Sequence, residues 1–438
     1  MQMNDDTLKS SKPIKGAHLG LMLLIFLNIL NMVDRNLIAS FGTEISHDLD
    51  LTDTQFGLLT GPLFVFFYAI MGLFVGRMAD MVHRPKLIAV GVLVWSVLTA
   101  VSGAARSFIH IGLARMFVAV GESCLSPASM SMLSDMFPPA KRGMASGLYY
   151  LGVPLGAGAS YIIAAELGPV LGWRNCFYIL GGVGLLLVPA ILLLRDPQRG
   201  RFDSPEQKDT VTTTGVIDSV RQVLSVAKKS PALSWAMISA VFMHLPIGAG
   251  QFVQMWLVRE RGFDAGGMAL FGLLFIVFGI IGILIGGLAS DWYIKHFKGG
   301  RLRFLALFML VIAPFLVSYR FVSPDSPLFY VGMCAGFLSF TAFYGPVFST
   351  VQDLSPTKLR GVTTAILLLM CNLVGLGLGA LATGVLSDLY SSQGAQEPLT
   401  FALLSIDIVG ILTIVSLFIG SVHWQSQFGR TIINKSNI

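Results

Sequence analysis

The sequence predicts an all-α protein that crosses a membrane many times. Of its 438 residues, 54% are hydrophobic and only 12% are charged, whereas soluble domains carry about 25% charged residues. Apolar runs of about 20 residues, the length that lets a helix cross a bilayer, recur along the chain. Strands of a membrane β-barrel need only about ten residues. The composition therefore excludes a soluble globular protein, and its richness in Leu, Val, Ile and Phe excludes a disordered one.

Twelve apolar stretches are expected to form the membrane helices. They lie near residues 17–46, 55–79, 86–105, 108–134, 143–166, 174–194, 231–257, 268–290, 302–322, 327–351, 361–387 and 399–422. A polar stretch at 196–230 separates the first six from the last six. We therefore expect an N-terminal six-helix bundle in 1–195, a cytoplasmic central loop in 196–230 and a C-terminal six-helix bundle in 231–438.

The distribution of Lys and Arg predicts the orientation, because these residues are concentrated in cytoplasmic loops. If the N-terminus is cytoplasmic, the segments on that side hold 23 of the 30 Lys and Arg residues, and the opposite segments hold 5. Both termini are therefore expected in the cytoplasm. The basic excess there faces the anionic lipid of the bilayer, so it does not indicate nucleic-acid binding.

Two loop motifs occur twice in the chain. Gly76-x3-Asp80 follows the second predicted helix, and Gly287-x3-Asp291 follows the eighth. The spaced set between helices 4 and 5 returns between helices 10 and 11: Asp135, Pro138, Arg142 and Gly143 match Asp353, Pro356, Arg360 and Gly361. The two offsets, 211 and 218 residues, differ by only seven. This register indicates a duplicated six-helix half, which is one of the architectures of secondary transporters.

The charges in these loops have two interpretations. Loop charges are usually solvated, and an isolated surface ion pair contributes little stability. Two copies at equivalent loops favour ion pairs between neighbouring helix ends that hold the cytoplasmic side closed in one conformation. The predicted gating residues are Gly76, Asp80, Arg84, Asp135, Arg142, Asp291, Asp353 and Arg360.

The stretch GRMADMVHRPK, from Gly76 to Lys86, resembles the signature loop between helices 2 and 3 of the major facilitator superfamily. It departs from that signature at His83, where Gly is usual, and at Pro85, where Arg is usual. With the twelve helices and the duplicated loops, the resemblance covers nearly the whole chain. It implies two six-helix bundles around a central cavity that opens alternately to the two sides of the membrane.

Three further stretches resemble the spinster subgroup of that superfamily. They are NMVDR from Asn31 to Arg35, RMFVAVGES from Arg115 to Ser123, with Ala119 in place of a usual Gly, and GVPLGAG from Gly152 to Gly158. Spinster-like proteins are associated with lysophospholipids and sphingosine phosphates, and bacterial members resemble proton-coupled transporters. Carriers of anions and sugar acids share parts of these motifs. The resemblance implies a multi-pass protein of a bacterial inner membrane, which we expect to be a monomer.

Five charged residues are candidates for a role inside the membrane, where ionisable groups are costly and usually functional. Asp34 and Arg35 lie in helix 1, Arg115 and Glu122 lie in helix 4, and Asp407 lies in helix 12. At about 100° per residue, Glu122 and Ser126 fall within about 20° of Arg115. Asn31 similarly shares a face with Arg35, so each helix carries one narrow polar stripe that cannot face lipid.

The chemistry of these residues suggests their roles. Arg keeps its proton and binds anions well, whereas a carboxylate can gain and lose a proton. We therefore predict that Asp34 and Glu122 couple transport to protons, and that the substrate-binding residues in this half are Arg35, Arg115, Asn31 and Ser126. The alternative is a set of static ion pairs that only fixes helix packing, although such pairs gain little stability over apolar packing.

The second half offers fewer polar groups at depth. His244 and Gln251 are seven residues apart on helix 7, and Phe343 and Tyr344 lie on helix 10. All four are predicted to bind substrate, with the aromatic rings suited to an acyl chain. The alternative for His and aromatic residues is ordinary packing, although His titrates in a useful range. Asp407 has no Arg nearby in sequence and suits a helix-packing hydrogen bond as well as a functional role.

Together these features predict a proton-coupled secondary transporter of an amphipathic anion, such as a lysophospholipid or a sphingosine phosphate. The alternatives are a carrier of a small organic or sugar acid and a drug/proton antiporter, and both symport and exchange remain open. An enzyme is not expected, because the chain has no HExxH or GxSxG motif. We expect no metal and no cofactor, with protons as the coupling ion.

Overall fold

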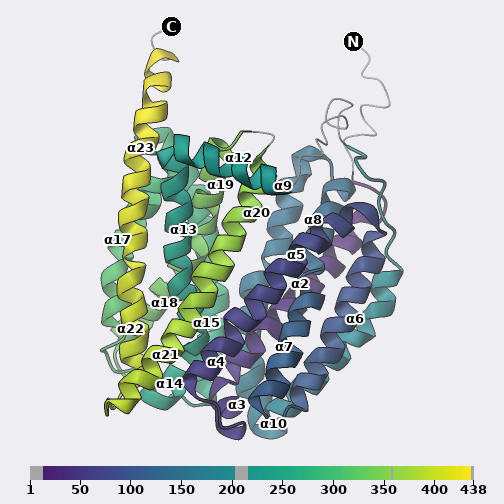
Figure 1. Cartoon of the computed structure of the whole chain (residues 1–438), viewed down its shortest axis with the longest axis vertical. Coiled ribbons are helices and arrows are strands. Elements are labelled where there is room, and N and C mark those ends of the chain that lie inside the picture. Colours follow the sequence, from purple (N-terminus) through teal and green to yellow (C-terminus); the bar gives the residue numbers. More distant parts are fainter. Residues whose placement is uncertain (1–12, 203–215, 357–358, 436–438) are drawn as a thin grey trace. The chain divides into compact units, whose positions relative to one another are not determined.

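The computed structural model describes residues 13–202, 216–356 and 359–435, and these residues form helices and no strand (Figure 1). Contacts divide the chain into two compact units. Unit 1 consists of Met1–Asp50, Leu63–Thr213 and Ala265–Gly272, and unit 2 consists of Leu51–Pro62, Thr214–Asp264 and Leu273–Ile438. Each unit takes a short segment from the other half of the sequence, so the two units are not continuous stretches of chain. The predicted domain boundaries at residues 195 and 231 stay a prediction.

The helices of unit 1 follow one another in an up-and-down order. They are α2 (Ala17–Ser40), α3 (Gly42–Asp48), α5 (Pro62–Met81), α6 (Arg84–Gly103), α7 (Phe108–Glu122), α8 (Leu125–Met136), α9 (Pro139–Tyr150) and α10 (Gly152–Leu192). We call the end at which α2 begins the terminal end of the unit, and the end at which α3 ends the far end. The turn from α5 to α6 and the turn from α8 to α9 both lie at the terminal end.

The predicted number of membrane helices is confirmed. Eleven described stretches are long and apolar enough to cross a membrane. One of them, Pro139–Leu192, holds 54 residues. Within it the backbone breaks at Gly172, which has φ 75° and ψ 158°, a conformation that Gly adopts without a steric penalty. This stretch therefore contains two membrane helices, which brings the total to twelve.

Unit 2 has the same alternation. Its elements are α4 (Asp53–Thr60), α12 (Val216–Lys229), α13 (Pro231–Ala249), η1 (Gly250–Phe252), α14 (Val253–Arg261), α15 (Ala265–Leu284), η2 (Ile285–Ala289), α16 (Ser290–His296), α17 (Gly300–Ser318), α18 (Pro327–Ala342), α19 (Tyr344–Leu354), α20 (Arg360–Met370), η4 (Cys371–Gly377), α21 (Leu378–Ser392), α22 (Pro398–Gly410) and α23 (Leu412–Lys435). Its terminal end is where α13 begins and α23 ends. Pro stands in the first turn of α13, α18 and α22, where its missing N–H removes no helical hydrogen bond.

Two short segments account for the interleaving of the units. In unit 2, α4 packs against α21, and the carboxylate of Asp388 accepts hydrogen bonds from the backbone N–H groups of Asp53 and Thr54 at 3.1 and 2.8 Å. These N–H groups at the start of α4 have no partner within the helix itself, so Asp388 caps the helix. In unit 1, the ring of Phe271 packs edge-on against Tyr161, with centroids 4.8 Å apart.

Glycines bring the helices of unit 1 close together. A Cβ atom on Gly121 of α7 would lie 2.8 Å from the carbonyl oxygen of Gly91 in α6. A Cβ atom on Gly156 of α10 would lie 2.5 Å from the carbonyl oxygen of Ile29 in α2. Small residues at helix contacts let backbones approach in this way inside a membrane. The close contacts bring the polar stripes of α2, α6 and α7 to the interior of the unit.

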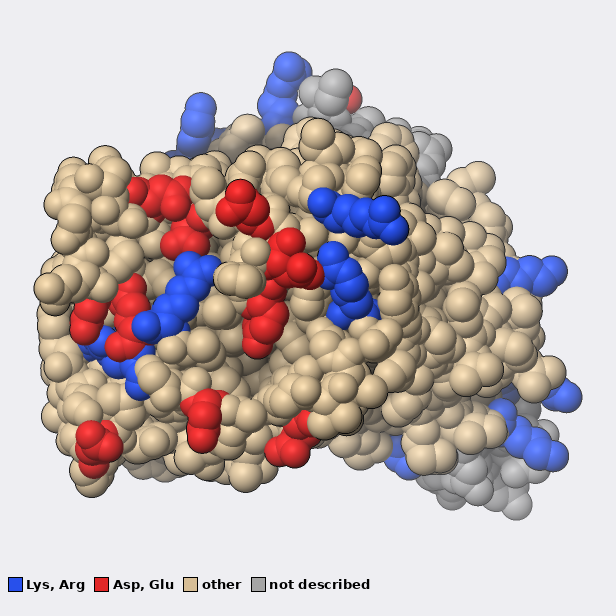
Figure 2. Space-filling view, turned by 90° about the horizontal axis from the view of Figure 1, so that it is seen from below, with Lys and Arg blue, Asp and Glu red and all other residues tan. Residues whose placement is uncertain are grey.

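The far end of each unit carries exposed acidic side chains. In unit 1 they are Glu44, Asp48 and Asp50, and in unit 2 they include Asp264 and Asp325. Figure 2 shows Asp and Glu side chains together with a few Lys or Arg on the surface seen from below.

Candidate functional site

The four charges predicted inside helices 1 and 4 meet within unit 1. Arg35 on α2 donates from Nε and Nη2 to Oε2 of Glu122 on α7, at 3.2 and 3.1 Å. Asp34 lies beside Arg115, with 3.8 Å between Oδ1 and Nη1. Both pairs join α2 to α7, and the two acidic and two basic side chains sum to zero formal charge.

Burial differs between the two pairs. Asp34, Arg115 and Glu122 are almost fully buried, at 1–2% exposure. The side chain of Arg35 is 26% exposed. Arg35 is therefore the accessible cation of the cluster. The side chains of Asp34, Arg115 and Glu122 are shielded from solvent.

Two elements that the sequence reasoning did not single out complete the cluster. Thr99 on α6 donates its hydroxyl proton to Oδ2 of Asp34 at 2.6 Å. Two rings of α5 stack on the guanidinium groups: Tyr68 lies 4.4 Å from Arg35, and Phe64 lies 5.0 Å from Arg35 and 4.8 Å from Arg115. Such cation–π contacts hold a guanidinium in place without using its N–H groups.

Several buried polar atoms of the cluster have no hydrogen-bond partner among the described residues. They are Nε and Nη1 of Arg115, Oδ1 of Asp34 and Oε1 of Glu122. A buried donor or acceptor without a partner is costly, so these atoms mark a place where a polar ligand would gain hydrogen bonds. Arg115 supplies donors for an anion, and the two carboxylates supply positions for a proton.

Asn31 and Ser126 are the other two residues of unit 1 that were predicted to bind substrate. Asn31 is buried on α2, one turn before Asp34. Ser126 is half-buried on α8, which begins three residues after α7 ends at Glu122. The two residues between these helices, Ser123 and Cys124, keep right-handed helical φ and ψ angles. The substrate roles of both residues stay predictions.

In unit 2 the mid-helix polar group is a neutral pair. His244 on α13 is buried, and its Nδ1 lies 2.7 Å from the carbonyl oxygen of Ala240. A carbonyl only accepts, so Nδ1 carries the proton and Nε2 of the neutral ring accepts from the Tyr344 hydroxyl at 3.2 Å. Phe343 is fully buried and belongs to the apolar core cluster of this unit. Gln251 lies in the 3-10 turn η1, outside the regular spacing of α13.

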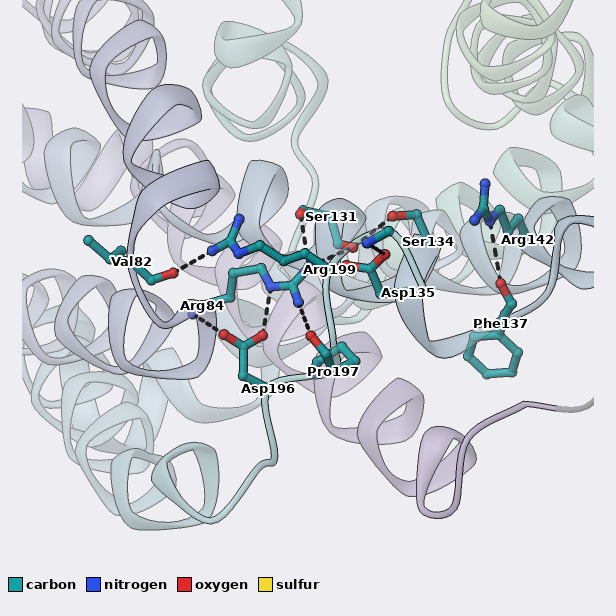
Figure 3. A network of polar contacts seen from close by, with 11 residues as sticks. Val82, Arg84, Ser131, Ser134, Asp135, Phe137, Arg142, Asp196, Pro197 and Arg199 are labelled. Atoms are coloured by element: carbon teal, nitrogen blue, oxygen red, sulfur yellow. Dashed lines mark hydrogen bonds and ion pairs between the residues drawn. The ribbon is translucent and has the colours of Figure 1, made fainter. Parts of the chain in front are cut away.

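Two of the predicted gating residues of unit 1, Arg84 and Asp135, form an ion pair at the terminal end, within the polar network that Figure 3 shows. Arg84 is 0% exposed. It donates to Asp135, to Oδ1 of Asp196 at 2.7 Å, to the backbone oxygen of Ser131 at 3.1 Å and to that of Pro197. It thereby ties the start of α6 to the end of α8 and to the chain that follows α10. Asp196 and Pro197 were not predicted to take part.

The second copy of this arrangement lies in unit 2. Arg301 donates to Oδ1 of Asp291 at 3.0 Å and to Oδ2 of Asp353 at 2.9 Å. Arg301 lies 217 residues after Arg84, and Asp353 lies 218 residues after Asp135. Arg301 was missed by the sequence reasoning, although its offset from Arg84 is within one residue of that of the second duplicated motif. The ion pair of Arg301 and Asp353 is more exposed than that of Arg84 and Asp135: the Arg301 side chain is 23% exposed and that of Asp353 is 61% exposed.

The other duplicated residues contact backbone. Nε of Arg142 lies 3.4 Å from the carbonyl oxygen of Phe137, and Nε of Arg360 lies 3.0 Å from that of Gln352. Each Arg thus binds a carbonyl group at the end of the preceding helix, where such groups lack a helical partner. The surroundings of Gly76 and of the Asp80 side chain lie outside what the structure describes.

Asp407, which has no Arg nearby in sequence, has one in space. Oδ2 of Asp407 on α22 accepts from Nε of Arg320 at 2.9 Å. Arg320 follows α17 at the far end of unit 2 and is 5% exposed. Its guanidinium lies 4.7 Å from the ring of Trp256 and 4.5 Å from that of Tyr319. Burial of Arg320 was not predicted, because its surroundings in the sequence are those of a loop.

The fold and the charged helix interior define a polytopic membrane transport protein. Residues 24–380 match the family model described as the Major Facilitator Superfamily, and the chain belongs to this family. The protein is therefore an integral multi-pass membrane protein of a family of transporters rather than enzymes.

Two proteins of known sequence and one solved structure are similar to this chain over most of its length. The chain is 28% identical over 427 residues to a protein of Mycolicibacterium smegmatis named MFS-type efflux pump, covering 96% of this chain and 95% of that one. It is 24% identical over 422 residues to protein spinster homolog 3 of Danio rerio, covering 90% and 83%. Its fold is similar to the crystal structure of a bacterial homologue of the human lysosomal transporter spinster, inward-facing and unoccupied, with a TM-score of 0.81, 23% identity and coverage of 94% and 98%.

Proposed function

We propose that this protein is a proton-coupled secondary transporter of an amphipathic anion, such as a lysophospholipid or a sphingosine phosphate, that works by alternating access. The observation that carries the proposal is the guanidinium pair of unit 1. Arg115 is buried with unpartnered N–H groups, and Arg35 is accessible beside it. A relative from Danio rerio, 25% identical over 284 residues, is named sphingosine-1-phosphate transporter, which supports a substrate of this kind.

The charge balance of the cluster supports coupling to protons. Its two Arg and two carboxylate groups are neutral together, so an anion that enters alone leaves net negative charge in a low-dielectric interior. That charge is costly to bury without a partner. A proton taken up by Asp34 or Glu122 restores neutrality. Binding of the anion and of the proton therefore favour one another.

The geometry suggests separate roles for the two carboxylates. Glu122 holds the accessible Arg35, so an anionic head group competes with Glu122 for that guanidinium. Asp34 is held by Thr99 and lies only loosely beside Arg115. Protonation of Asp34 removes its attraction for Arg115 and frees that guanidinium for the substrate. Competition between the anion and Glu122 for Arg35 is compatible with exchange of substrate and proton. Release of Arg115 by protonated Asp34 is compatible with symport of the two.

Transport of NBD-labelled lysophosphatidylglycerol into proteoliposomes tests this proposal. We expect Asp34→Asn to bind the lipid but to lose its response to an imposed pH gradient, because the neutral amide cannot exchange a proton. Asp48→Asn, which alters an exposed pair with Arg174 in the same unit, serves as the matched control and should keep the response. Transport by Asp34→Asn with the gradient dependence of the wild type would refute the proton role.

A small organic acid is the alternative substrate. A relative from Cupriavidus necator, 26% identical over 414 residues, is named probable sulfoacetate transporter. Sulfoacetate also presents anionic groups to Arg35 and Arg115 but has no acyl chain. Competition in a binding assay separates the two classes: displacement of the labelled lysolipid by unlabelled lysolipid but not by sulfoacetate supports the first, and the reverse supports the second. Proton-driven efflux of ethidium would instead support a drug/proton antiporter.

We further propose that both termini and the segment 196–230 lie in the cytoplasm of a bacterial cell, and that the protein acts as a monomer. The bias of Lys and Arg toward the terminal end supports this orientation. Gln222 on α12 is exposed, so a Gln222→Cys variant can be labelled. We expect it to resist impermeant maleimide added to intact cells and to react after lysis. Labelling in intact cells would reverse the orientation.

The terminal-end ion pairs are proposed to act as the gate of alternating access. Each ion pair joins the ends of two different helices: Arg84 on α6 pairs with Asp135 on α8, and Arg301 on α17 pairs with Asp353 on α19. The pairs therefore restrict movement of these helix ends. We expect Asp135→Asn to shift the protein toward states open at the terminal end. Distances between spin labels at that end measure this shift, and unchanged distances together with unchanged transport would remove the gate assignment.

A further inference from the structure

The helix α12 (Val216–Lys229) has no role in the proposed transport cycle. One of its faces packs against unit 2: Val223 is 1% exposed, and Val226 and Ala227 pack against the apolar core cluster that includes Leu233 and Val351. Figure 1 shows α12 lying across the terminal end of unit 2, transverse to α13. A helix in this position runs along the membrane surface rather than through the bilayer.

The other face of α12 combines one exposed apolar side chain with three cations. Leu224 is 53% exposed. It lines a surface depression of about 350 Å³ together with Arg221, Ser225, Lys228 and Lys229. Arg221 precedes Leu224 by one helical turn and Lys228 follows it by one turn, so the three share a face. Among the described residues, none of the three cations forms an ion pair with a carboxylate.

We propose that this face of α12 binds the headgroup of an anionic phospholipid of the surrounding bilayer. The three cations and the Ser225 hydroxyl provide donors for a phosphate group in the depression. Leu224 enters the boundary between headgroups and acyl chains, as apolar residues of interfacial helices do. Each Lys or Arg near an anionic membrane surface strengthens binding about fivefold. Charge complementarity therefore favours an anionic lipid over a zwitterionic one.

The test uses the full chain in nanodiscs, with a bimane label on Gln222→Cys, an exposed neighbour that does not line the depression. Brominated phosphatidylglycerol, at increasing fractions in phosphatidylcholine, is compared with brominated phosphatidylcholine as the quencher. We expect phosphatidylglycerol to quench at the lower mole fraction. Protein without the introduced Cys gives the background from the native cysteines.

Variants then assign the preference to the cations. We expect Lys228→Gln to raise the phosphatidylglycerol fraction for half quenching about fivefold, and the triple change of Arg221, Lys228 and Lys229 to Gln to abolish the preference. The matched control changes Lys295, Lys298 and Arg303 to Gln; these are exposed residues at the same end of unit 2, and their loss should leave the preference intact.

Three results would overturn the proposal. The first is equal quenching by the two lipids, and the second is an unchanged preference in the triple variant. The third is loss of the preference in millimolar inorganic phosphate, which would assign the depression to a free anion instead of a lipid. Elution of each variant as a single peak in size-exclusion chromatography confirms that the surface changes leave the fold intact.

Discussion

The two units bury their charges at different depths. Unit 1 places Asp34 within α2 and places Arg115 and Glu122 inside the apolar span Phe108–Met136, where each is almost completely buried. Unit 2 has the neutral pair of His244 and Tyr344 at mid-helix. It buries its guanidinium, Arg320, at the far end beside Asp407. Two halves that share duplicated loops therefore differ in the polar groups that their helices bury.

This difference assigns different tasks to the two units. A buried ion pair gains little stability over apolar packing, so the mid-helix charges of unit 1 are better explained by ligand and proton binding than by folding. The pair at Arg320 is stacked between two rings and lies away from the middle of the helices, which suits a structural role. The terminal ends show a second contrast, because Arg84 is buried and Arg301 is half-buried in an otherwise equivalent pair.

The largest expected effect concerns this terminal-end contrast. Arg84→Gln leaves the buried Asp135 and its neighbour Asp196 without their cation, and loss of one partner of a buried pair costs about 3–5 kcal/mol. Arg301→Gln is the matched change in unit 2 and should cost at most about 1 kcal/mol, because its partners are exposed. Thermal unfolding in detergent measures both, and equal losses would show that burial does not distinguish the two pairs.

The next effect tests the mid-helix contrast. Arg35→Ala removes the accessible cation of the unit 1 cluster and leaves Glu122 unpaired, so binding of labelled lysophosphatidylglycerol should fall by about 100-fold or more. Arg174→Ala, which alters an exposed pair of the same unit, should leave binding within a few-fold of the wild type. An Arg35→Ala protein that binds normally would place the head group elsewhere.

A smaller effect is expected from the neutral pair of unit 2. Tyr344→Phe removes one hydrogen bond to His244, a loss of about 1 kcal/mol, so lysolipid binding should change by no more than about fivefold. Tyr390→Phe breaks a comparable hydroxyl contact, with Ser405 at 3.0 Å, and controls for the general effect of losing a tyrosine hydroxyl. A loss with Tyr344→Phe as large as that with Arg35→Ala would contradict the assignment of charge recognition to unit 1.

The smallest effect is a pH dependence at the far end of unit 2. Hydrogen bonds from Arg261 lower the pKa of Glu397, so the folded protein holds this proton less tightly than the unfolded chain. The contact therefore stabilises above the ordinary pKa of Glu and is lost as pH falls through the lowered value. The Glu397 side chain is half-exposed, so the gain is at most about 1 kcal/mol.

Thermal unfolding of the wild type and of Glu397→Gln across acidic pH measures this contribution. The wild type should be slightly more stable at neutral pH, and the difference should disappear in acid. Asp325→Asn, which changes an exposed carboxylate at the same end, should show no such convergence. A constant difference at every pH would show that the charge of Glu397 does not contribute.

The sequence by itself determined the number of membrane helices, the duplicated loops and the identity of the charges within helices 1 and 4. These follow from local composition and spacing, because a bilayer requires about 20 apolar residues per span and penalises every ionisable group within it. Asp34, Arg35, Arg115 and Glu122 therefore stand out in the sequence as charges within apolar helices.

Only the tertiary structure decided which charges pair. Spacing along α2 and α7 does not show that Arg35 takes Glu122 while Asp34 takes Thr99 and Arg115, because those contacts depend on how closely the glycines of α6, α7 and α10 let the helices approach. Partners far away in sequence, such as Arg320 for Asp407 and Asp196 for Arg84, were likewise missed. The interruptions of regular α-helix after Glu122 and after Ala249, across which the faces of Ser126 and Gln251 were predicted, were likewise not visible in the spacing.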